Sequence, residues 1–334
     1  MALSEKIALV TGASRGIGRG IALQLAEAGA KVYITGRHPQ QSGSTSDATL
    51  PSLEKTAEEV RERGLRWGGD CVAVYCDHAS DADVESLFAT IKENEQGRLD
   101  LLVNNAFSAV NAIAGSMGRK FYELPTSIYD EVNAVGLRGH YVCAVHAVRM
   151  MVENKPPGGG LVVNVSSVGS IKYLFNVAYG MGKTALDRMT ADMAVECAET
   201  GVTVVSLWPG AVKTELTLQL VEQADMREKY ATDGLSADDV KDIFKTQAES
   251  TEFSGRAVVA LASDARVGQK AGRCLVAADL ADEYGFTDVD GSRPGSMRAI
   301  KSLLRMYQWK KTAGFVPRWL KIPGWLIAAA TKNY

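Results

Sequence analysis

The sequence has few of the residues that build disulfide frameworks or metal sites. Its five cysteines are odd in number and scattered, and none belongs to a C-x-x-C pair. The four histidines, at His38, His78, His140 and His146, also lack the spacing of metal ligands and are interpreted as incidental. We therefore expect neither a disulfide scaffold nor a bound metal, and we expect a protein of a reducing, intracellular compartment such as the cytoplasm.

Long hydrophobic runs and a strong charge bias are missing as well. No apolar stretch is long enough to span a bilayer, and the chain reaches its first apolar segment at Ile7 without the basic region of a cleavable signal. The formal net charge of −2 argues against a nucleic-acid binder, which usually carries a basic excess. With 334 residues, 46% of them hydrophobic, the chain is long enough for one large α/β domain or two smaller ones.

Acidic residues are absent from residues 291–334, which contain nine Lys or Arg. Residues 1–290 hold the other 28 basic and all 39 acidic residues, so we expect the main domain there and a separate basic, aromatic C-terminal extension. The extension either lies on a membrane surface, for example peripherally on the endoplasmic reticulum, or packs over its own pocket or a partner subunit. Pro317 and Pro323 divide it into pieces too short for one amphipathic helix, which favours packing.

Glycines recur where the first apolar segment ends. Residues 7–10 form a short apolar run, and the spacing of Ile21, Leu23 and Leu25 predicts a helix that ends near Gly29. Strand, glycine turn and helix in this order favour a bound phosphate over a plain tight turn, because the free N–H groups and dipole of the helix start attract anions. The predicted pyrophosphate-binding residues are Gly12, Ser14, Arg15, Gly16, Ile17 and Gly18.

An acidic residue is also missing where one would normally hold the ribose hydroxyls of NAD. The second expected strand, residues 31–35, is followed by Gly36 and Arg37. Arg37, together with Arg15 in the glycine turn, suits a 2′-phosphate, because guanidinium groups form charge-assisted hydrogen bonds with phosphate. We therefore predict NADP(H) as the cofactor, with two solvated surface arginines as the alternative.

Apolar strands alternate with helical segments along the rest of the chain. This alternation predicts an α/β fold with a Rossmann-type, doubly wound parallel sheet and helices on both faces. Residues 215–250 are rich in charge and are expected to form a substrate lid or a surface helical pair. The expected strands span 31–35, 71–76, 101–106, 161–165, 202–207 and 272–277, and the expected helices span 53–63, 81–93, 126–152 and 179–200.

Polar residues stand at the carboxyl ends of three expected strands, the edge at which open α/β sheets bind ligands. Asp77 suits a position near the adenine, although a capping or turn aspartate would look the same in the sequence. Asn104 and Asn105 follow the next strand, and we expect such amides both to tie neighbouring strands and to face the cleft. Ser166 and Ser167 follow the expected strand 161–165, where a hydroxyl either forms a hydrogen bond with a substrate carbonyl or starts a turn.

Tyr179 and Lys183 are four residues apart in an expected helix, so they share one helix face. A free tyrosine has a pKa of about 10, so a neighbouring ammonium is needed if the phenol is to exchange protons near neutrality. A solvated pair is the ordinary outcome of this spacing. The serines and the glycine turn elsewhere in the chain favour a catalytic pair instead.

In this order the motifs resemble those of the short-chain dehydrogenase/reductases over about residues 5–290. Three further runs, Val135 to Tyr141, Phe175 to Tyr179 and Ile322 to Trp325, resemble a subgroup associated with NADPH-dependent reduction of hydrophobic ketones, including steroids and xenobiotic carbonyls. The motifs that carry the family resemblance are Thr11-Gly12…Gly16…Gly18, Asn104-Asn105-Ala106, Ser167, Tyr179…Lys183 and Pro209 to Thr214.

The resemblance implies a role for each matching residue. Tyr179 would donate a proton to a carbonyl oxygen, Lys183 would lower the tyrosine pKa and hold the nicotinamide ribose, and Ser167 would orient the carbonyl. Asn105 and Asp77 would line the cofactor cleft, Ile17 would meet the pyrophosphate, and Thr214 would bind the carboxamide. It also implies a homo-oligomer.

The chain departs from the family pattern at three points. Phe107 follows Asn-Asn-Ala where glycine is usual, and the loop between Ser167 and Gly169 is one residue short, which leaves Ser166 as an alternative to Ser167. The position of a catalytic asparagine in the long helix is Gly136, and Asn133, three residues earlier, lies on a similar helix face.

These observations predict an NADP-dependent carbonyl reductase that acts on an apolar ketone or aldehyde, or on the matching secondary alcohol. The alternatives are a nucleotide-binding protein that has lost turnover through Gly136 and the short serine loop, and a membrane-associated interaction protein built on the basic extension. The sequence names neither the physiological substrate nor the direction of the reaction.

Overall fold

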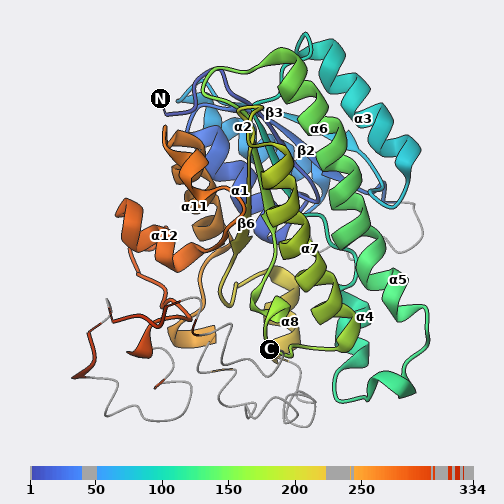
Figure 1. Ribbon diagram of the computed structural model, residues 1–334, viewed down its shortest axis with the longest axis vertical. Helices are drawn as coiled ribbons and strands as arrows, with labels where there is room; N and C mark the ends of the chain where they lie inside the picture. Colours follow the sequence, from blue (N-terminus) through green and yellow to red (C-terminus); the bar gives the residue numbers. More distant parts are fainter. Residues whose placement is uncertain are drawn as a thin grey trace.

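The computed structural model describes residues 2–39, 51–222, 241, 244–301, 304, 315–317, 320–323 and 326. In this part of the chain seven strands form one parallel sheet in the order β3-β2-β1-β4-β5-β6-β7. The predicted doubly wound α/β fold is confirmed (Figure 1). The strands are β1 (Ile7–Val10), β2 (Lys31–Gly36), β3 (Asp70–Tyr75), β4 (Leu101–Asn104), β5 (Leu161–Val165), β6 (Thr203–Trp208) and β7 (Cys274–Val276).

The strand sequences follow from their place in the sheet. A parallel sheet covered on both faces needs apolar residues at successive positions, not alternate ones. β1, β4, β5 and β6 are accordingly buried along their whole length, whereas the edge strands β3 and β7 are partly exposed.

Helices cover the sheet in two layers (Figure 1). One layer contains α1 (Gly16–Glu27), α2 (Leu53–Leu65), α11 (Thr251–Ser263) and α12 (Ala277–Tyr284). The other contains α3 (Asp81–Asn94), α6 (His140–Asn154) and α7 (Val177–Glu196). The shorter elements are α4 (Val110–Ser116), α5 (Ile128–Asn133), α8 (Glu215–Glu222) and the short turns η1 (Phe121–Glu123), η2 (Ala134–Gly139), η3 (Val168–Ser170) and η5 (Val267–Lys270).

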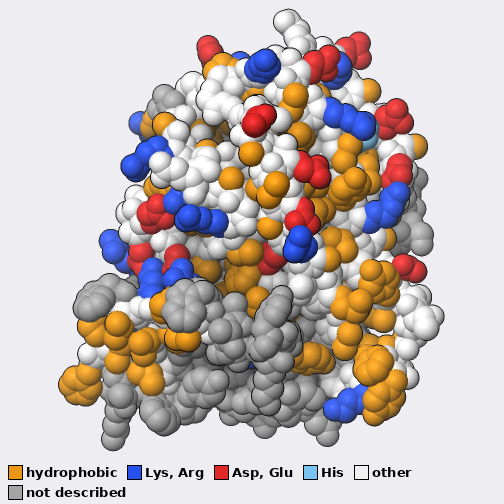
Figure 2. Space-filling view, viewed as in Figure 1, with side chains coloured by type: hydrophobic (Ala, Val, Ile, Leu, Met, Phe, Trp, Pro, Cys, Tyr) orange, Lys and Arg blue, Asp and Glu red, His pale blue; other side chains and the backbone are white. Residues whose placement is uncertain are grey.

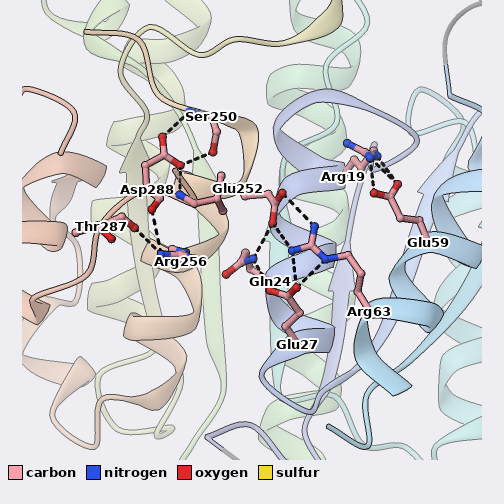
Figure 3. Close-up of polar contacts among 11 residues, drawn as sticks. Arg19, Gln24, Glu27, Glu59, Arg63, Ser250, Glu252, Arg256, Thr287 and Asp288 are labelled. Carbon is pink, nitrogen blue, oxygen red and sulfur yellow. Dashed lines mark hydrogen bonds and ion pairs between the residues drawn. The ribbon is translucent and has the colours of Figure 1, made fainter. Parts of the chain in front are cut away.

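Ion pairs join the first helical layer across elements distant in sequence (Figure 3). Arg63 on α2 donates to Glu27 on α1 at 2.7 Å and to Glu252 on α11 at 2.8 Å. Gln24 on α1 also donates to Glu252, at 2.7 Å. Because Gly20 packs so closely that a Cβ would lie 2.2 Å from the carbonyl oxygen of Thr251, α1 and α11 meet backbone to backbone under this network.

The predicted helix over residues 126–152 is one helical run in the structure, but it changes winding in the middle. α5 passes into a π-helical turn, η2, and then into α6. The turn contains Gly136 and Gly139, and a Cβ at Gly139 would lie 2.6 Å from the carbonyl oxygen of His78. Close backbone packing therefore accompanies the wider winding, which hydrophobic periodicity alone does not predict.

The predicted lid and C-terminal extension lie largely outside the described residues. α8, residue 241 and residues 244–250 are the described parts of the lid segment, and Glu249 in it pairs with Val212 in an isolated bridge. In the extension, Arg298 and Lys321 form ion pairs with Asp279 of α12 at 2.8 and 2.6 Å. The described part of the extension thus packs on the main domain. None of the helices among the described residues has the length and hydropathy needed to cross a membrane.

Candidate active site

The glycine turn lies at the carboxyl edge of the sheet, pressed against the end of β4. Gly12 has a φ of 63°, and a Cβ there would lie 2.6 Å from the Cα of Ala106. A Cβ at Gly18 would lie 2.4 Å from Nδ2 of Asn105. Asn105 Nδ2 in turn donates to the carbonyl oxygens of Thr11 and Gly12 at 2.9 and 3.0 Å. Glycine is therefore needed here because backbone and amide fill the space of a side chain.

The start of α1 already holds an anion in this structure. The N–H of Gly16 donates to Oε2 of Glu215, at the first position of α8, at 3.0 Å. No acidic residue stands in the first turn of α1, and Arg15 occupies its N-cap position. The arrangement fits the pyrophosphate of a dinucleotide, for which the Glu215 carboxylate is a stand-in, because exposed N–H groups at a helix start favour any anion. Pyrophosphate and Glu215 would compete for the same N–H.

A cleft of about 340 Å³ runs from the glycine turn to Tyr179 and Lys183. Gly18 and Ser167 are the two predicted site residues outside its lining: Gly18 lies behind the turn, and Ser167 contacts the tyrosine hydroxyl. The predicted residues that line the cleft are Gly12, Ser14, Arg15, Gly16, Ile17, Arg37, Asp77, Asn105, Tyr179, Lys183 and Thr214.

Asp77 and Thr214 each combine a place in the cleft with a local structural role. Oδ1 of Asp77 accepts from the N–H of Ala79 at 3.0 Å, so the aspartate stabilises a turn as well. Oγ1 of Thr214 accepts from the N–H of Thr217 at 3.1 Å at the start of α8. Their contacts with an adenine and a carboxamide stay predictions.

The amide pair after β4 divides its work as expected. Asn104 is fully buried and donates to Oδ1 of Asn164 on β5 at 2.9 Å, which ties two neighbouring strands. Asn105 holds the glycine turn and lines the cleft. One amide is therefore structural, and the other lies at the ligand side.

Tyr179 and Lys183 lie one turn apart on α7, with the tyrosine in its first turn. Asn176 caps this helix by accepting from the N–H of Tyr179 at 2.8 Å, which fixes the backbone at the tyrosine. The hydroxyls of Ser167 and Tyr179 are 2.8 Å apart. Ser166 instead lies 3.5 Å from the carbonyl oxygen of Lys183. The structure therefore brings Ser167, and not Ser166, to the phenol.

Burial sets the protonation of Tyr179 and Lys183. Lys183 is buried and its Nζ donates to the carbonyl oxygen of Val165 at 3.0 Å. Burial lowers the pKa of Lys183 to about 8, against the opposing charge of Asp187. Burial raises the pKa of Tyr179 to about 12, although its hydrogen bond with Ser167 acts in the other direction.

The expectation that the pKa of Tyr179 lies below its ordinary value is therefore wrong for this structure. The ammonium lies over the tyrosine ring, 5.8 Å from its centroid, and donates to a backbone carbonyl. Desolvation of the phenolate raises the pKa of Tyr179 and outweighs the hydrogen bond with Ser167, and the charge of Asp187 acts in the same upward direction. Tyr179 stays a neutral phenol with a proton to donate.

The two candidate positions for the missing asparagine have different surroundings. A Cβ at Gly136 would lie 2.6 Å from Cδ2 of Phe107, so an aromatic ring takes the space that a side chain at residue 136 would need. Nδ2 of Asn133 donates to the carbonyl oxygens of Tyr129 and Ala178, at 3.0 and 3.3 Å. Asn133 therefore ties α5 to α7 next to Tyr179. A water-holding role for it stays a prediction.

Several residues that shape the site were missed by the sequence. His140 and His78 were interpreted as incidental, yet both are buried: His140 donates to the carbonyl oxygen of Ala106 at 2.9 Å, and His78 contacts Thr35 at 2.7 Å. Glu215 directly follows Thr214, and Asp187 stands one turn after Lys183 on α7. That helical spacing was the available signal for Asp187, and nothing in the sequence placed Glu215 at α1. Among the described residues no cluster suited to a metal ion occurs.

A model of the short chain dehydrogenase family matches residues 6–225 of the chain. The chain belongs to the short-chain dehydrogenase family. It is 43% identical to human dehydrogenase/reductase SDR family member 1 over 338 residues, which cover 99% of each protein. It is also 30% identical to NADPH-dependent aldehyde reductase 2, chloroplastic, of Arabidopsis thaliana, over 71% of this chain and 85% of that one.

A solved member of the short-chain dehydrogenase family has the same fold. A short-chain type dehydrogenase/reductase from Mycobacterium marinum superposes with a TM-score of 0.63 at 27% identity, covering 82% of this chain and 94% of that one. The resemblance predicted from the motifs is thereby confirmed, both for the family and for the narrower likeness to family member 1.

Proposed function

We propose that this short-chain dehydrogenase is an NADP(H)-dependent carbonyl reductase that interconverts an apolar ketone or aldehyde and its alcohol. The observation that carries the proposal is the contact of Ser167, Tyr179 and Lys183 at one end of a cleft whose other end is a glycine turn suited to pyrophosphate. A binding protein without chemistry would not need a buried, protonated phenol beside a buried ammonium.

The residues divide the reaction between them. Bound NADPH would supply hydride to the carbonyl carbon, and a proton must reach the carbonyl oxygen at the same time. Tyr179, protonated because burial raises its pKa, donates that proton, while Ser167 holds the carbonyl by a hydrogen bond. The Lys183 ammonium stabilises the phenolate that remains, so charge does not accumulate on the substrate oxygen.

Arg37 and Arg15 support NADP(H) over NAD(H). Both line the cleft at its glycine end, and β2 ends without the acidic residue that would bond a ribose 2′-hydroxyl. The Arabidopsis relative is named an NADPH-dependent reductase, which supports the same cofactor here.

Apolar side chains around Tyr179 support an apolar substrate. The rings of Phe107 and Phe175 lie edge-on to the Tyr179 ring, with centroids 6.0 and 5.1 Å away. Figure 2 shows hydrophobic side chains gathering toward the end of the molecule that carries α4 and α8, whereas charged side chains are spread over the opposite end. Steroidal and xenobiotic carbonyl compounds have this apolar character.

Absorbance at the NADPH band, with a panel of aromatic and steroidal ketones, tests the proposal. The intact protein should oxidise NADPH, and Tyr179→Phe should lose turnover while it still binds NADPH. Tight NADPH binding without oxidation by either protein would favour the alternative that Gly136 raises, a nucleotide-binding protein without turnover.

We further propose that the protein forms a homo-oligomer and that its C-terminal extension packs on protein. Exposed apolar residues on α6 and α7, namely Tyr141, Met181 and Val195, support an interface there. The ion pairs of Arg298 and Lys321 with α12 support packing of the extension. Light scattering tests the first. Detergent-free fractionation of intact and tail-deleted protein tests the second, since a cytoplasmic protein stays soluble in both forms and a peripheral membrane protein sediments only when intact.

A further inference from the structure

Phe107 and Gly136 are complementary in space. A Cβ at Gly136 would lie 2.6 Å from Cδ2 and 3.0 Å from Cε2 of the Phe107 ring, distances that no side chain can adopt unless the ring moves. Gly136 lies in the π-helical turn η2, whereas Phe107 follows β4, so the pair joins two elements that are distant in sequence. The glycine therefore admits the ring.

The same ring lies against both members of the catalytic pair. Nζ of Lys183 is 5.2 Å from the centroid of the Phe107 ring, within the range of a cation–π contact. The ring also meets Tyr179 edge-on, with an interplanar angle of 81°. Because Lys183 is buried, water does not screen its attraction to the ring face.

The backbone beside the ring is held by a buried side chain. Nε2 of His140, a residue that is only 1% exposed, donates to the carbonyl oxygen of Ala106 at 2.9 Å. Burial and the charge of Lys183 lower the pKa of His140 to about 3, so the imidazole is neutral and does not repel the ammonium. The position of Phe107 is therefore fixed from two sides, by the space at Gly136 and by the tie at Ala106.

We propose that Phe107 is a positioning residue for Lys183, whose ammonium is held between the ring face and the Val165 carbonyl, and that Gly136 is glycine because any larger residue displaces that ring. This inference rests on the proposed function and deepens it. In this account the Phe107 ring occupies the space that a side chain at residue 136 would need, and from there it contacts the catalytic lysine.

Other charged and titratable groups also surround Lys183. Tyr179 and Asp187 face it from α7 itself, and His140 approaches from α6. Like the attraction of Asp187, the Phe107 contact acts only on the charged form of the lysine. Its effect must therefore fade as pH rises through the pKa of Lys183, about 8.

Urea unfolding of Phe107→Leu, compared with the native protein at about pH 7 and about pH 9.5, tests the contact without any need for activity. Leucine keeps apolar burial but removes the ring, so the loss of stability should be clearly larger at the lower pH. Phe107→Tyr keeps a ring and should show little of this pH dependence. An equal loss at both pH values for Phe107→Leu would overturn the proposal.

A double-mutant cycle tests the role of Gly136. Gly136→Ala should destabilise the native protein, but much less in a Phe107→Ala background, where no ring is left to displace. Gly115→Ala is the matched control. Gly115 lies in a different helix, α4, and a Cβ there would meet nothing within 4 Å. Additive effects of the two substitutions would show that residue 136 and the ring are independent.

Turnover separates this inference from the proposed function. In the direction of reduction, the alkaline fall of kcat should move to lower pH in Phe107→Leu by about half a unit to one unit, because the ammonium loses a stabilising contact. A protein that oxidises no NADPH would refute the proposed function and leave both unfolding tests in force. An active protein with an unmoved alkaline fall would refute the positioning role alone.

Discussion

At one end of the cleft, proposed to bind pyrophosphate, glycine brings the turn close against the end of β4, whereas at the other, proposed catalytic end it makes room for an aromatic ring. A Cβ at Gly12 or Gly18 would strike the segment that follows β4, and a Cβ at Gly136 would strike the Phe107 ring. The first end is a polar turn with an anion at the start of α1, and the second is an apolar pocket around a buried ammonium. Cofactor binding would therefore depend on a polar, closely packed turn, and the proposed chemistry on an apolar pocket in the same cleft.

The difference predicts that the two ends can be disabled separately, and the catalytic end should show the larger effect. Lys183→Met should lower kcat by about 10²- to 10⁴-fold, because the phenolate loses its cation. The same change should raise the melting temperature at neutral pH. Burial lowers the lysine pKa to about 8, below its ordinary value, so the charged form costs stability that methionine does not.

Steady-state assays and thermal unfolding of the same preparation check both halves of this prediction. Lost activity with a lower melting temperature would mean that Lys183 is mainly structural. Retained activity would remove it from the chemistry.

At the other end, Gly18→Ala should weaken NADPH binding by about 10- to 100-fold while any remaining bound enzyme turns over normally. The added methyl meets Asn105 Nδ2 at 2.4 Å and pushes the turn away from the strand end, a strain of about 1–3 kcal/mol. Fluorescence titration with NADPH measures the change, with Gly115→Ala as control. Unchanged affinity would show that the turn tolerates displacement and that its close packing does not serve binding.

The smallest expected effect lies at the adenosine end. Arg37→Ala should raise KM for NADPH by about tenfold and leave KM for NADH nearly unchanged, because the lost hydrogen bonds reach only the 2′-phosphate. The ratio of the two KM values is the measurement that decides. Equal changes in KM for both cofactors would show that Arg37 attracts either dinucleotide by its charge and does not select NADPH over NADH.

The sequence was sufficient for the parts of this protein that depend on local pattern. Apolar runs alternating with helices predicted the parallel sheet, and helical spacing put Tyr179 and Lys183 on one face of α7. The glycine turn was recognisable because strand, glycines and helix are consecutive in the chain.

Contacts between distant elements could not be predicted in the same way. Ser166 and Ser167 follow the same strand, and only the turn into η3 decides which hydroxyl meets the phenol. The sequence showed that Phe107 and Gly136 each depart from the family pattern, but not that they touch. Their contact joins the end of β4 to a π-helical turn, which hydrophobic periodicity does not predict. The direction of the Tyr179 pKa shift was predicted wrongly because burial, which decides it, is a property of the folded chain.

The most direct test of the proposed reaction is the path of the hydride. NADPH carrying deuterium at both C4 positions would be mixed with an excess of enzyme and an apolar aromatic ketone, and the alcohol analysed by mass spectrometry after one turnover. We expect the carbinol carbon to carry deuterium with the intact protein and Tyr179→Phe to form almost no alcohol. Bound NADPH that gives no deuterated alcohol with any ketone of the panel, or equal product from both proteins, would contradict the proposed reaction.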